Sequence, residues 1–248
     1  MPVPSPVAAA APARADTRRL GALILELVVT FAVVLAVAVV IGLVLEQLIA
    51  PVGSTTFDRH ITDWVFAHWR TRSGLSVMNR VSWLGGPIFV VPVTVATTLG
   101  LLLLRRWWLA AWFVTTVVGT ALLTTLARTI IDPRRPPGEL GLRHPFSSSF
   151  PSGHAAEAAA TYLGIGILVV VLTRSRAVRV LVWTLATGLI LAVGVARVYL
   201  AVHWTTDVLT GFVIGTLWVL GTARAFRLHP AREGTVAAPT DPSDGSPP

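Results

Sequence analysis

Apolar stretches long enough to cross a lipid bilayer constrain the fold of this chain more than any other feature. The longest carries no charged residue from position 27 to position 45. A transmembrane helix needs about 20 predominantly apolar residues. Five further runs approach or reach this length, at residues 86–104, 107–127, 154–173, 178–200 and 203–223. The pattern predicts an all-α integral membrane bundle of six transmembrane helices.

The composition also favours a membrane protein. Of the 248 residues, 54% are hydrophobic and only 13% are charged, whereas a soluble domain carries about 25% charged residues. Cysteine is absent, which excludes a disulfide framework and thiol chemistry. The first apolar run is too long for the core of a signal peptide, and no convincing cleavage site follows it, so we expect it to be retained.

The basic charge of the chain has two interpretations. The net charge is +8, and all 20 basic residues are arginine. Nucleic-acid binding is one possibility. However, the arginines occur in short clusters between apolar runs, as in the loops of membrane proteins. We therefore expect no nucleic-acid partner.

The two ends of the chain differ in composition from its centre. Residues 1–19 are rich in proline and alanine, and residues 229–248 are rich in proline, serine, aspartate and glycine. Both segments are predicted to be disordered. Residues 20–228 are then expected to form one membrane domain.

A segment between the first two apolar runs, FDRHITDWVFAHWR, has helical periodicity. Phe57, Ile61 and Trp64 recur on one side, together with Val65 and Trp69. Its charged residues fall mostly on the other side. This pattern is typical of an amphipathic helix in the membrane interface, and a packed helix in a soluble loop is the alternative.

The arginines also predict an orientation, because cytoplasmic loops carry an excess of basic residues. With the N-terminus inside, the cytoplasmic arginines are 14, 18, 19, 105, 106, 174, 176, 179, 224, 227 and 232. The opposite side has Arg59, Arg70, Arg72, Arg80, Arg128, Arg134, Arg135, Arg143 and Arg197. Several of the second group belong to the motifs described below. The remainder favour a multi-pass plasma-membrane protein with both termini in the cytoplasm.

Three polar segments are expected to meet on the extracytoplasmic side. They are RTIIDPRRP at 128–136, PSGH at 151–154 and RVYLAVHWTTD at 197–207. Their arginines, Arg128, Arg135 and Arg197, offer bidentate donors suited to phosphate oxygens. Ser152 and Gly153 precede a predicted helix, whose first amide groups and dipole favour an anion.

Two histidines supply candidate catalytic groups. His203 and Asp207 are four residues apart, so on a helix they would share a face. Asp207 would then fix the tautomer of His203 and leave its Nε2 nucleophilic. His154 would act as the acid for the leaving oxygen. Glu157, one turn later, either favours the protonated form of His154 or pairs with a nearby arginine.

Each of these residues alone has an ordinary explanation. A histidine at a helix start is often interfacial, a His/Asp pair is often structural, and arginines at span ends often extend to the membrane surface. An Arg or Asp at bilayer depth nevertheless costs about 2.5–3.5 kcal/mol on an insertion scale. Arg197 and Asp207 together therefore indicate a polar pocket between helices.

In combination the three segments resemble the type-2 phosphatidic acid phosphatase superfamily. Its pattern is a basic residue, six residues and Arg-Pro, then Pro-Ser-Gly-His, then Ser-Arg, five residues, His, three residues and Asp. Arg128, Arg135 and Pro136 match the first part, and residues 151–154 match the second. Arg197, His203 and Asp207 match the third. Two positions depart from the pattern: Arg128 replaces the usual Lys, and Ala196 replaces the usual Ser.

The resemblance implies a lipid-phosphate phosphatase that needs no metal or other cofactor. In this chemistry His203 forms a phosphohistidine, and His154 protonates the leaving group and later activates water. Arg128, Arg135, Arg197 and the turn at Ser152 and Gly153 bind the phosphoryl oxygens. Expected substrates in the bilayer are phosphatidic acid, phosphatidylglycerol phosphate or polyprenyl phosphates and diphosphates. The alternatives are a phosphotransferase that uses the same site and a membrane protein that binds an anion or lipid without catalysis.

Overall fold

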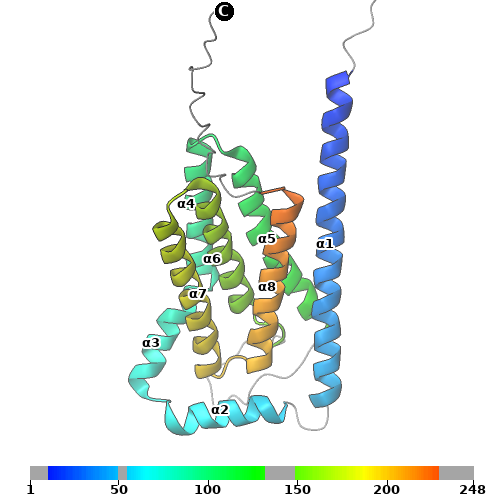
Figure 1. Ribbon diagram of the computed structural model, residues 1–248. Coiled ribbons are helices and arrows are strands. Elements are labelled where there is room, and N and C mark those ends of the chain that lie inside the picture. The colour runs from blue at the N-terminus through cyan, green and yellow to red at the C-terminus, as the bar shows by residue number, and fades with distance from the viewer. Residues whose placement is uncertain (1–10, 50–54, 132–148, 229–248) are drawn as a thin grey trace, which may run out of the picture.

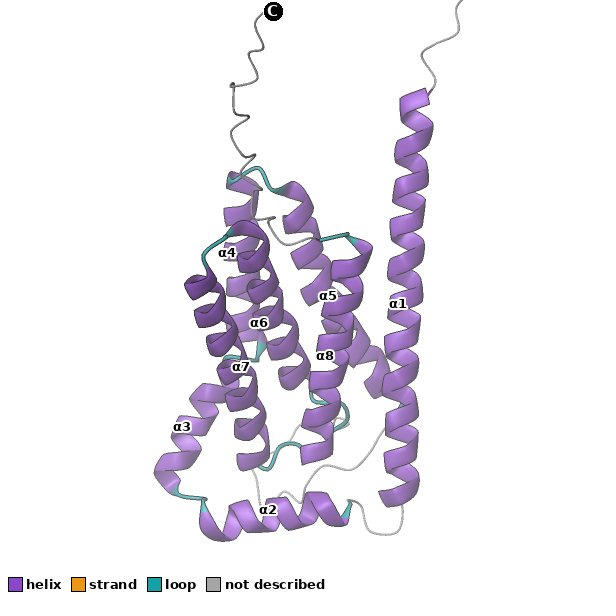
Figure 2. Cartoon of the chain, in the orientation of Figure 1, coloured by secondary structure: helices purple, strands orange, loops and turns teal. Residues whose placement is uncertain are grey.

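The computed structural model describes residues 11–49, 55–131 and 149–228, and these form eight helices without a strand. The helices are α1 (Ala11–Ile49), α2 (Thr56–His68), α3 (Arg72–Trp83), α4 (Pro87–Leu103), α5 (Trp107–Ile130), α6 (Gly153–Leu172), α7 (Arg176–Tyr199) and α8 (Thr205–Ala225). Figures 1 and 2 show that most of them run along one axis, while α2 lies across one end.

Six segments are long and apolar enough to cross a membrane, as the sequence predicts. Helices α1, α5, α6, α7 and α8 provide one each, and α3 and α4 together provide the other. The all-α membrane fold is therefore confirmed. Helix α1 begins at Ala11 and therefore includes residues 11–19, while the domain boundaries drawn from the sequence stay a prediction.

Helix α6 occupies the centre of the bundle, with α5, α7 and α8 packed around it. Its contact with α8 depends on small residues. Gly211 and Gly215, one turn apart on α8, lie against the backbone carbonyls of Ser152 and Ala156. A Cβ atom at either glycine would approach these carbonyl oxygens to 2.6 and 2.5 Å. Two helices that approach this closely need small residues at the contact, so the spacing of α6 and α8 is fixed by backbone atoms.

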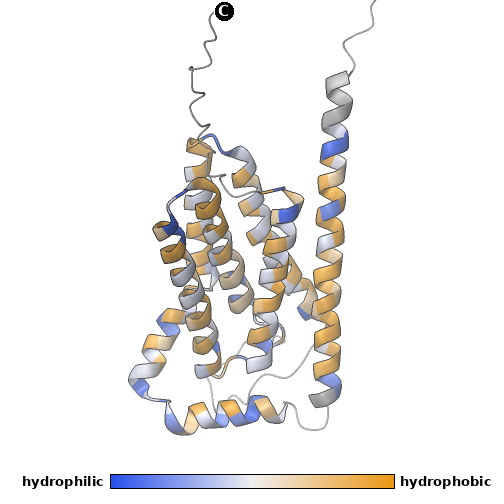
Figure 3. Cartoon of the chain, in the orientation of Figure 1, coloured by the Kyte–Doolittle hydropathy of each residue, from blue (hydrophilic) through white to orange (hydrophobic). Residues whose placement is uncertain are grey.

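Helix α1 packs on the outside of the bundle, against α5 and α8. The ring of Phe31 meets the ring of Trp218 edge-on, with their centroids 5.5 Å apart. Thr30 fills the space left by Gly221 on α8. Many large apolar side chains of the helices are exposed, and Figure 3 shows hydrophobic residues along most of the bundle, as expected for a protein that faces lipid.

The start of α1 and the end of α8 lie at the same end of the bundle. The turns after α4 and α6, which carry Arg105, Arg106 and Arg174, also lie there. The opposite end holds α2, the end of α5 and the start of α8. The turns that carry Arg105, Arg106 and Arg174 thus lie at the end of the bundle where the prediction groups them with the N-terminus. Which end faces the cytoplasm stays a prediction.

Helix α2 is amphipathic, and its aromatic side chains face away from the bundle. Phe57, Trp64 and Trp69 are exposed, whereas Asp58 and Thr62 are buried against the protein. Val65 is also buried, although the sequence pattern places it with the aromatic residues. The helix therefore uses its polar side to contact the bundle, and it leaves the aromatic side available to the membrane interface.

Candidate active site

The end of α5 is joined to the turn that starts α6 through Arg128. The Nε and Nη2 atoms of Arg128 donate hydrogen bonds to the carbonyl of Pro151, at 3.3 and 3.1 Å. The guanidinium group also lies directly against Gly153, where a Cβ atom would collide with it. The first and second motifs are thus in contact, and the missing side chain of Gly153 makes room for Arg128.

The Ser-Gly turn leaves the N-terminus of α6 without a side-chain cap. Ser152 occupies the N-cap position, but its hydroxyl makes no capping hydrogen bond. This hydroxyl is buried and has no hydrogen-bond partner within the part of the chain that the structure describes. Because the first amides of a helix lack partners within the helix, this arrangement favours an anion at the start of α6.

His203 and Asp207 come together at the start of α8. Nδ1 of His203 lies 3.5 Å from Oδ2 of Asp207, and both residues are 3% exposed. This distance exceeds the usual 2.7–3.2 Å of a hydrogen bond, and catalytic hydrogen bonds are often long in the absence of substrate. The pair has the geometry that would orient Nε2 of the imidazole away from the carboxylate.

The reason for this contact differs from the prediction. The sequence places both residues on one helical face, but α8 begins at Thr205, and His203 lies before the helix. Trp204 takes the N-cap position, and its amide donates to Oδ2 of Asp207 at 2.9 Å. An acidic residue at this position of a helix commonly accepts from the N-cap amide. Asp207 therefore holds the turn that carries His203 as well as the imidazole itself.

The second and third motifs are joined through the backbone. The amide of Ser152 donates to the carbonyl of Asp207 at 3.1 Å. This bond places the turn before His154 next to the first turn of α8. Together with the Arg128–Pro151 bonds, it assembles residues from three helices at one end of the bundle.

Arg197 lies in the last turn of α7 and points towards α3. Its Nη1 atom donates to the hydroxyl of the buried residue Ser82 at 2.7 Å. Two residues later, the hydroxyl of Tyr199 donates to the carbonyl of Trp69 at 2.8 Å and accepts from the amide of Thr71 at 3.0 Å. The segment from α2 to α3 therefore contacts the end of α7 at two points.

His154 packs against a glycine pair that sequence reasoning did not identify. A Cβ atom on Gly86 would lie 2.8 Å from Nε2 of His154, and one on Gly85 would lie 2.5 Å from its carbonyl oxygen. The Gly-Gly-Pro sequence before the second span was the available signal. Because Gly85 and Gly86 have no side chains, the start of α4 packs directly against His154.

Asp58 is a second residue that sequence reasoning did not assign to the site. Its carboxylate is buried and accepts hydrogen bonds from the amide and hydroxyl of Thr206, at 2.9 and 2.8 Å. It also accepts from the hydroxyl of Thr55 at 2.8 Å. Thr206 precedes Asp207, so α2 is attached directly to the turn that carries the candidate pair His203 and Asp207. A carboxylate on an amphipathic helix gives no sequence signal for this contact.

Glu157 lies on α6 one turn after His154. Its Oε2 atom is buried and has no hydrogen-bond partner among the described residues. Which of the two interpretations of Glu157 holds stays a prediction.

The remaining predicted residue, Arg135, lies outside the described residues, as does Pro136. Within the described ranges, no group of three or more carboxylate or imidazole side chains gathers in a way that could hold a metal ion. The candidate residues that the structure describes are arginine, histidine, aspartate and glutamate side chains together with the start of α6.

Comparison with known proteins agrees with this geometry. Residues 131–230 match the model of the PAP2 superfamily, a range that begins three residues after Arg128 and includes the other candidate residues. The chain is 36% identical over 143 residues to phosphatidylglycerophosphatase B of Bacillus subtilis (strain 168), covering 57% of this chain and 70% of that protein.

A solved structure shows the same likeness. It is the crystal structure of a transmembrane PAP2-type phosphatidylglycerolphosphate phosphatase from Bacillus subtilis. It aligns with a TM-score of 0.63 and 28% sequence identity, over 75% of this chain and 94% of that one. The resemblance therefore extends over most of the helical bundle.

Proposed function

Because this chain belongs to the PAP2 superfamily, we propose that it is a membrane phosphatase that hydrolyses the phosphomonoester of a glycerophospholipid. The observation that carries the proposal is the His203–Asp207 pair, which the Ser152 amide joins to the start of α6. Both relatives are described as phosphatases of phosphatidylglycerol phosphate, so we propose this lipid as the first substrate to test.

In the proposed reaction His203 is the nucleophile. Asp207 accepts a hydrogen bond from Nδ1–H of His203, and the Nε2 lone pair attacks phosphorus. A P–N bond forms while the P–O bond to the lipid alcohol breaks. His154 transfers its proton to the departing oxygen. Water then attacks phosphorus and loses a proton to His154, which releases inorganic phosphate and restores His203.

The negative charge of the phosphoryl group needs stabilisation throughout this sequence. Arg128 and Arg197 are held by Pro151 and Ser82, so they need little reorganisation when charge develops. We propose that both bind the phosphoryl oxygens, together with Arg135 and with Ser152 and Gly153 at the start of α6. Guanidinium groups are suited to this role because they form bidentate hydrogen bonds with phosphate oxygens.

The position of the site suits a substrate that remains in the bilayer. The candidate residues lie at one end of the bundle, where α2 presents its exposed aromatic side. We propose that this end faces the extracytoplasmic side of the plasma membrane, in accordance with the distribution of arginines. A lipid would then approach laterally with its headgroup at the level of the site.

The decisive experiment measures phosphate release by the purified protein in detergent. The substrates are phosphatidylglycerol phosphate, phosphatidic acid and a polyprenyl diphosphate, and the variants are His203→Ala and His60→Ala. His60 is an exposed residue of α2 at the same end of the molecule. We expect His203→Ala to remove activity and His60→Ala to retain it. Equal activity in His203→Ala and wild type would refute the assignment of the nucleophile.

Two other functions give different results in the same assay. A phosphotransferase would move the phosphoryl group to an added alcohol in preference to water, which product analysis detects. A protein that only binds lipids or anions would release no phosphate from any substrate.

A further inference from the structure

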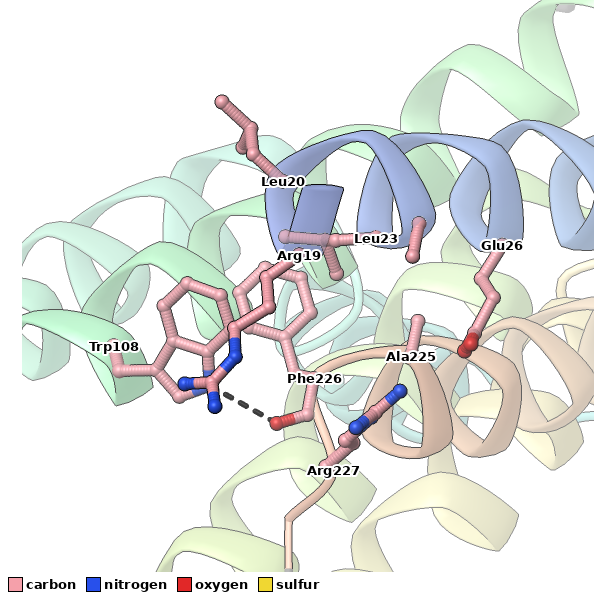
Figure 4. Close-up of a pocket in the computed structure, with 9 residues that line it drawn as sticks. Arg19, Leu20, Leu23, Glu26, Trp108, Ala225, Phe226 and Arg227 are labelled. Carbon is pink, nitrogen blue, oxygen red and sulfur yellow. Dashed lines mark hydrogen bonds between the residues drawn. The ribbon is translucent and has the colours of Figure 1, made fainter. Parts of the chain in front are cut away.

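A cavity of about 440 Å³ lies at the end of the bundle opposite to the candidate active site. Figure 4 shows how residues 19–26 of α1, the start of α5 and the end of α8 line it. Arg19 and Glu26 line it from α1, and Arg227 lines it from the turn after α8. An adjoining cavity of about 400 Å³ shares Glu26 and Arg227 and adds Arg224.

The charged groups of these cavities are not neutralised by one another. No hydrogen bond or ion pair joins the side chains of Arg19, Arg227 and Glu26 in the part of the chain that the structure describes. Three arginine side chains and one glutamate side chain thus line the two cavities. The cavities therefore carry excess positive charge next to the bilayer.

Arg227 stands at a backbone position that favours glycine. It has φ of 53°, in the left-handed region, and its amide donates to the carbonyl of Arg224 at 2.8 Å. Glycine is usual where a helix ends in this way, because other residues adopt this conformation at a cost. The chain instead has an arginine there, and its side chain lines the cavity.

The remaining wall of the cavity is aromatic and apolar. The indole N–H of Trp108 donates to the carbonyl of Phe226 at 2.9 Å, and the two rings pack with centroids 4.7 Å apart. Leu20 and Leu23 of α1 line the same space. Tryptophan is typical of the level where lipid headgroups meet acyl chains. The cavity therefore offers cationic donors beside apolar surface, the combination that a phospholipid needs.

We propose that this pocket binds the headgroup of an anionic glycerophospholipid from the membrane leaflet at that end. The phosphate would contact Arg19 and Arg227, and the first part of the acyl chains would contact Leu20 and Leu23. The excess of arginine over glutamate selects a lipid with net negative charge over a zwitterionic one. The site lies far from His203 and binds a phosphodiester, so it is independent of the proposed hydrolysis.

The test is native mass spectrometry of the full chain in detergent with equal amounts of phosphatidylglycerol and phosphatidylcholine. Wild type is expected to retain phosphatidylglycerol preferentially. Arg19→Gln/Arg227→Gln should lower this retention about 30-fold, because each of the two basic residues near an anionic lipid contributes about fivefold. The matched control is Arg174→Gln/Arg176→Gln, which removes two exposed arginines at the same end outside the cavity. Equal retention in both double variants would overturn the proposal.

Glu26→Gln is expected to change the retention of phosphatidylglycerol in the opposite direction. Removal of the only carboxylate that lines the two described cavities should strengthen retention of phosphatidylglycerol. Unchanged or weaker retention of phosphatidylglycerol would refute an anionic headgroup next to Glu26. Soluble glycerophosphoglycerol should not displace the lipid, and displacement at millimolar concentration would show that the acyl chains contribute nothing. Thermal unfolding of each variant confirms that the bundle is intact.

Discussion

The carboxylate of Asp58 holds both the backbone amide and the hydroxyl of Thr206, the residue immediately before Asp207. Asp58 belongs to α2, which lies across the end of the bundle, and Thr206 belongs to the first turn of α8. Helix α2 is therefore connected to the turn of His203 and Asp207, the proposed catalytic pair, through one buried carboxylate.

Asp58→Asn tests this connection. Asparagine keeps only one of the two accepting oxygens of the carboxylate, so one of the bonds from Thr206 is lost, and a lost bond to a charged group costs about 2 kcal/mol. We expect kcat for phosphate release to fall by up to about 30-fold, with little change in KM. Asp63→Asn, on the exposed side of the same helix, should have no effect. If kcat is unchanged in Asp58→Asn, α2 does not position Asp207.

Gly86→Ala tests the packing of the start of α4 against His154. The added methyl group would lie 2.8 Å from Nε2 of His154, so the imidazole must move. Misplacement of a catalytic group by about 1 Å can cost ~100-fold in rate. We expect activity to fall by at least tenfold while the thermal unfolding temperature changes little.

The control for Gly86→Ala lies on the same helix. A Cβ atom at Gly100 would meet nothing within 4 Å, so Gly100→Ala should retain activity. It should also raise stability by about 0.5–1 kcal/mol, because alanine favours a helix. Comparable loss of activity in the two variants would show that helix propensity, and not contact with His154, explains the effect.

Gly211→Ala tests the close contact of α6 and α8. Its methyl group would approach the backbone oxygen of Ser152 to 2.6 Å, and a backbone atom cannot move aside as a flexible side chain does. Overpacking of this kind costs about 1–3 kcal/mol. We expect a lower unfolding temperature together with lower activity. A Cβ atom at Gly188 on α7 would meet no atom within 4 Å. Gly188→Ala should therefore lower neither the unfolding temperature nor the activity.

Arg128 is the position where this chain departs from the usual lysine of its family. Arg128→Lys keeps the positive charge but loses the two-point contact with Pro151, and we expect activity within about tenfold of wild type. Arg128→Gln removes the charge, and we expect a loss of about 100-fold, the value for removal of one donor to a developing anion. Steady-state phosphate release measures both. Equal activity in the two variants would mean that the charge of Arg128 does not contribute.

A chelator tests whether arginines alone supply the positive charge in catalysis. In the proposed reaction Arg128, Arg135 and Arg197 take this part, so phosphate release should be unchanged in excess chelator. Complete loss that returns when a divalent metal is added would contradict the proposed mechanism.

Sequence reasoning predicts the spans well because lipid requires long apolar helices. The predicted run 154–173 corresponds to α6 at Gly153–Leu172, and the run 178–200 corresponds to α7 at Arg176–Tyr199. The error at His203 has a local cause. Spacing by four residues suggests a helical face, but the turn before α8 brings His203 and Asp207 together without one.

The contacts of Asp58 and Gly86 could not be predicted in the same way. Both depend on elements that are distant in sequence, since Asp58 meets Thr206 and Gly86 meets His154. Periodicity describes one helix at a time and contains no information about which helix end reaches another. The motifs identify the chemistry, and the tertiary arrangement determines which neighbours hold it in place.

The glycine contact between α6 and α8 has a consequence for engineering. With Gly211 and Gly215 touching the opposite main chain, the distance between the two helix axes is a property of the scaffold and not of replaceable side chains. Grafting the histidines and arginines onto another helical protein would therefore fail unless its axes were first brought equally near. Redesign should begin with that separation and choose the reactive residues afterwards.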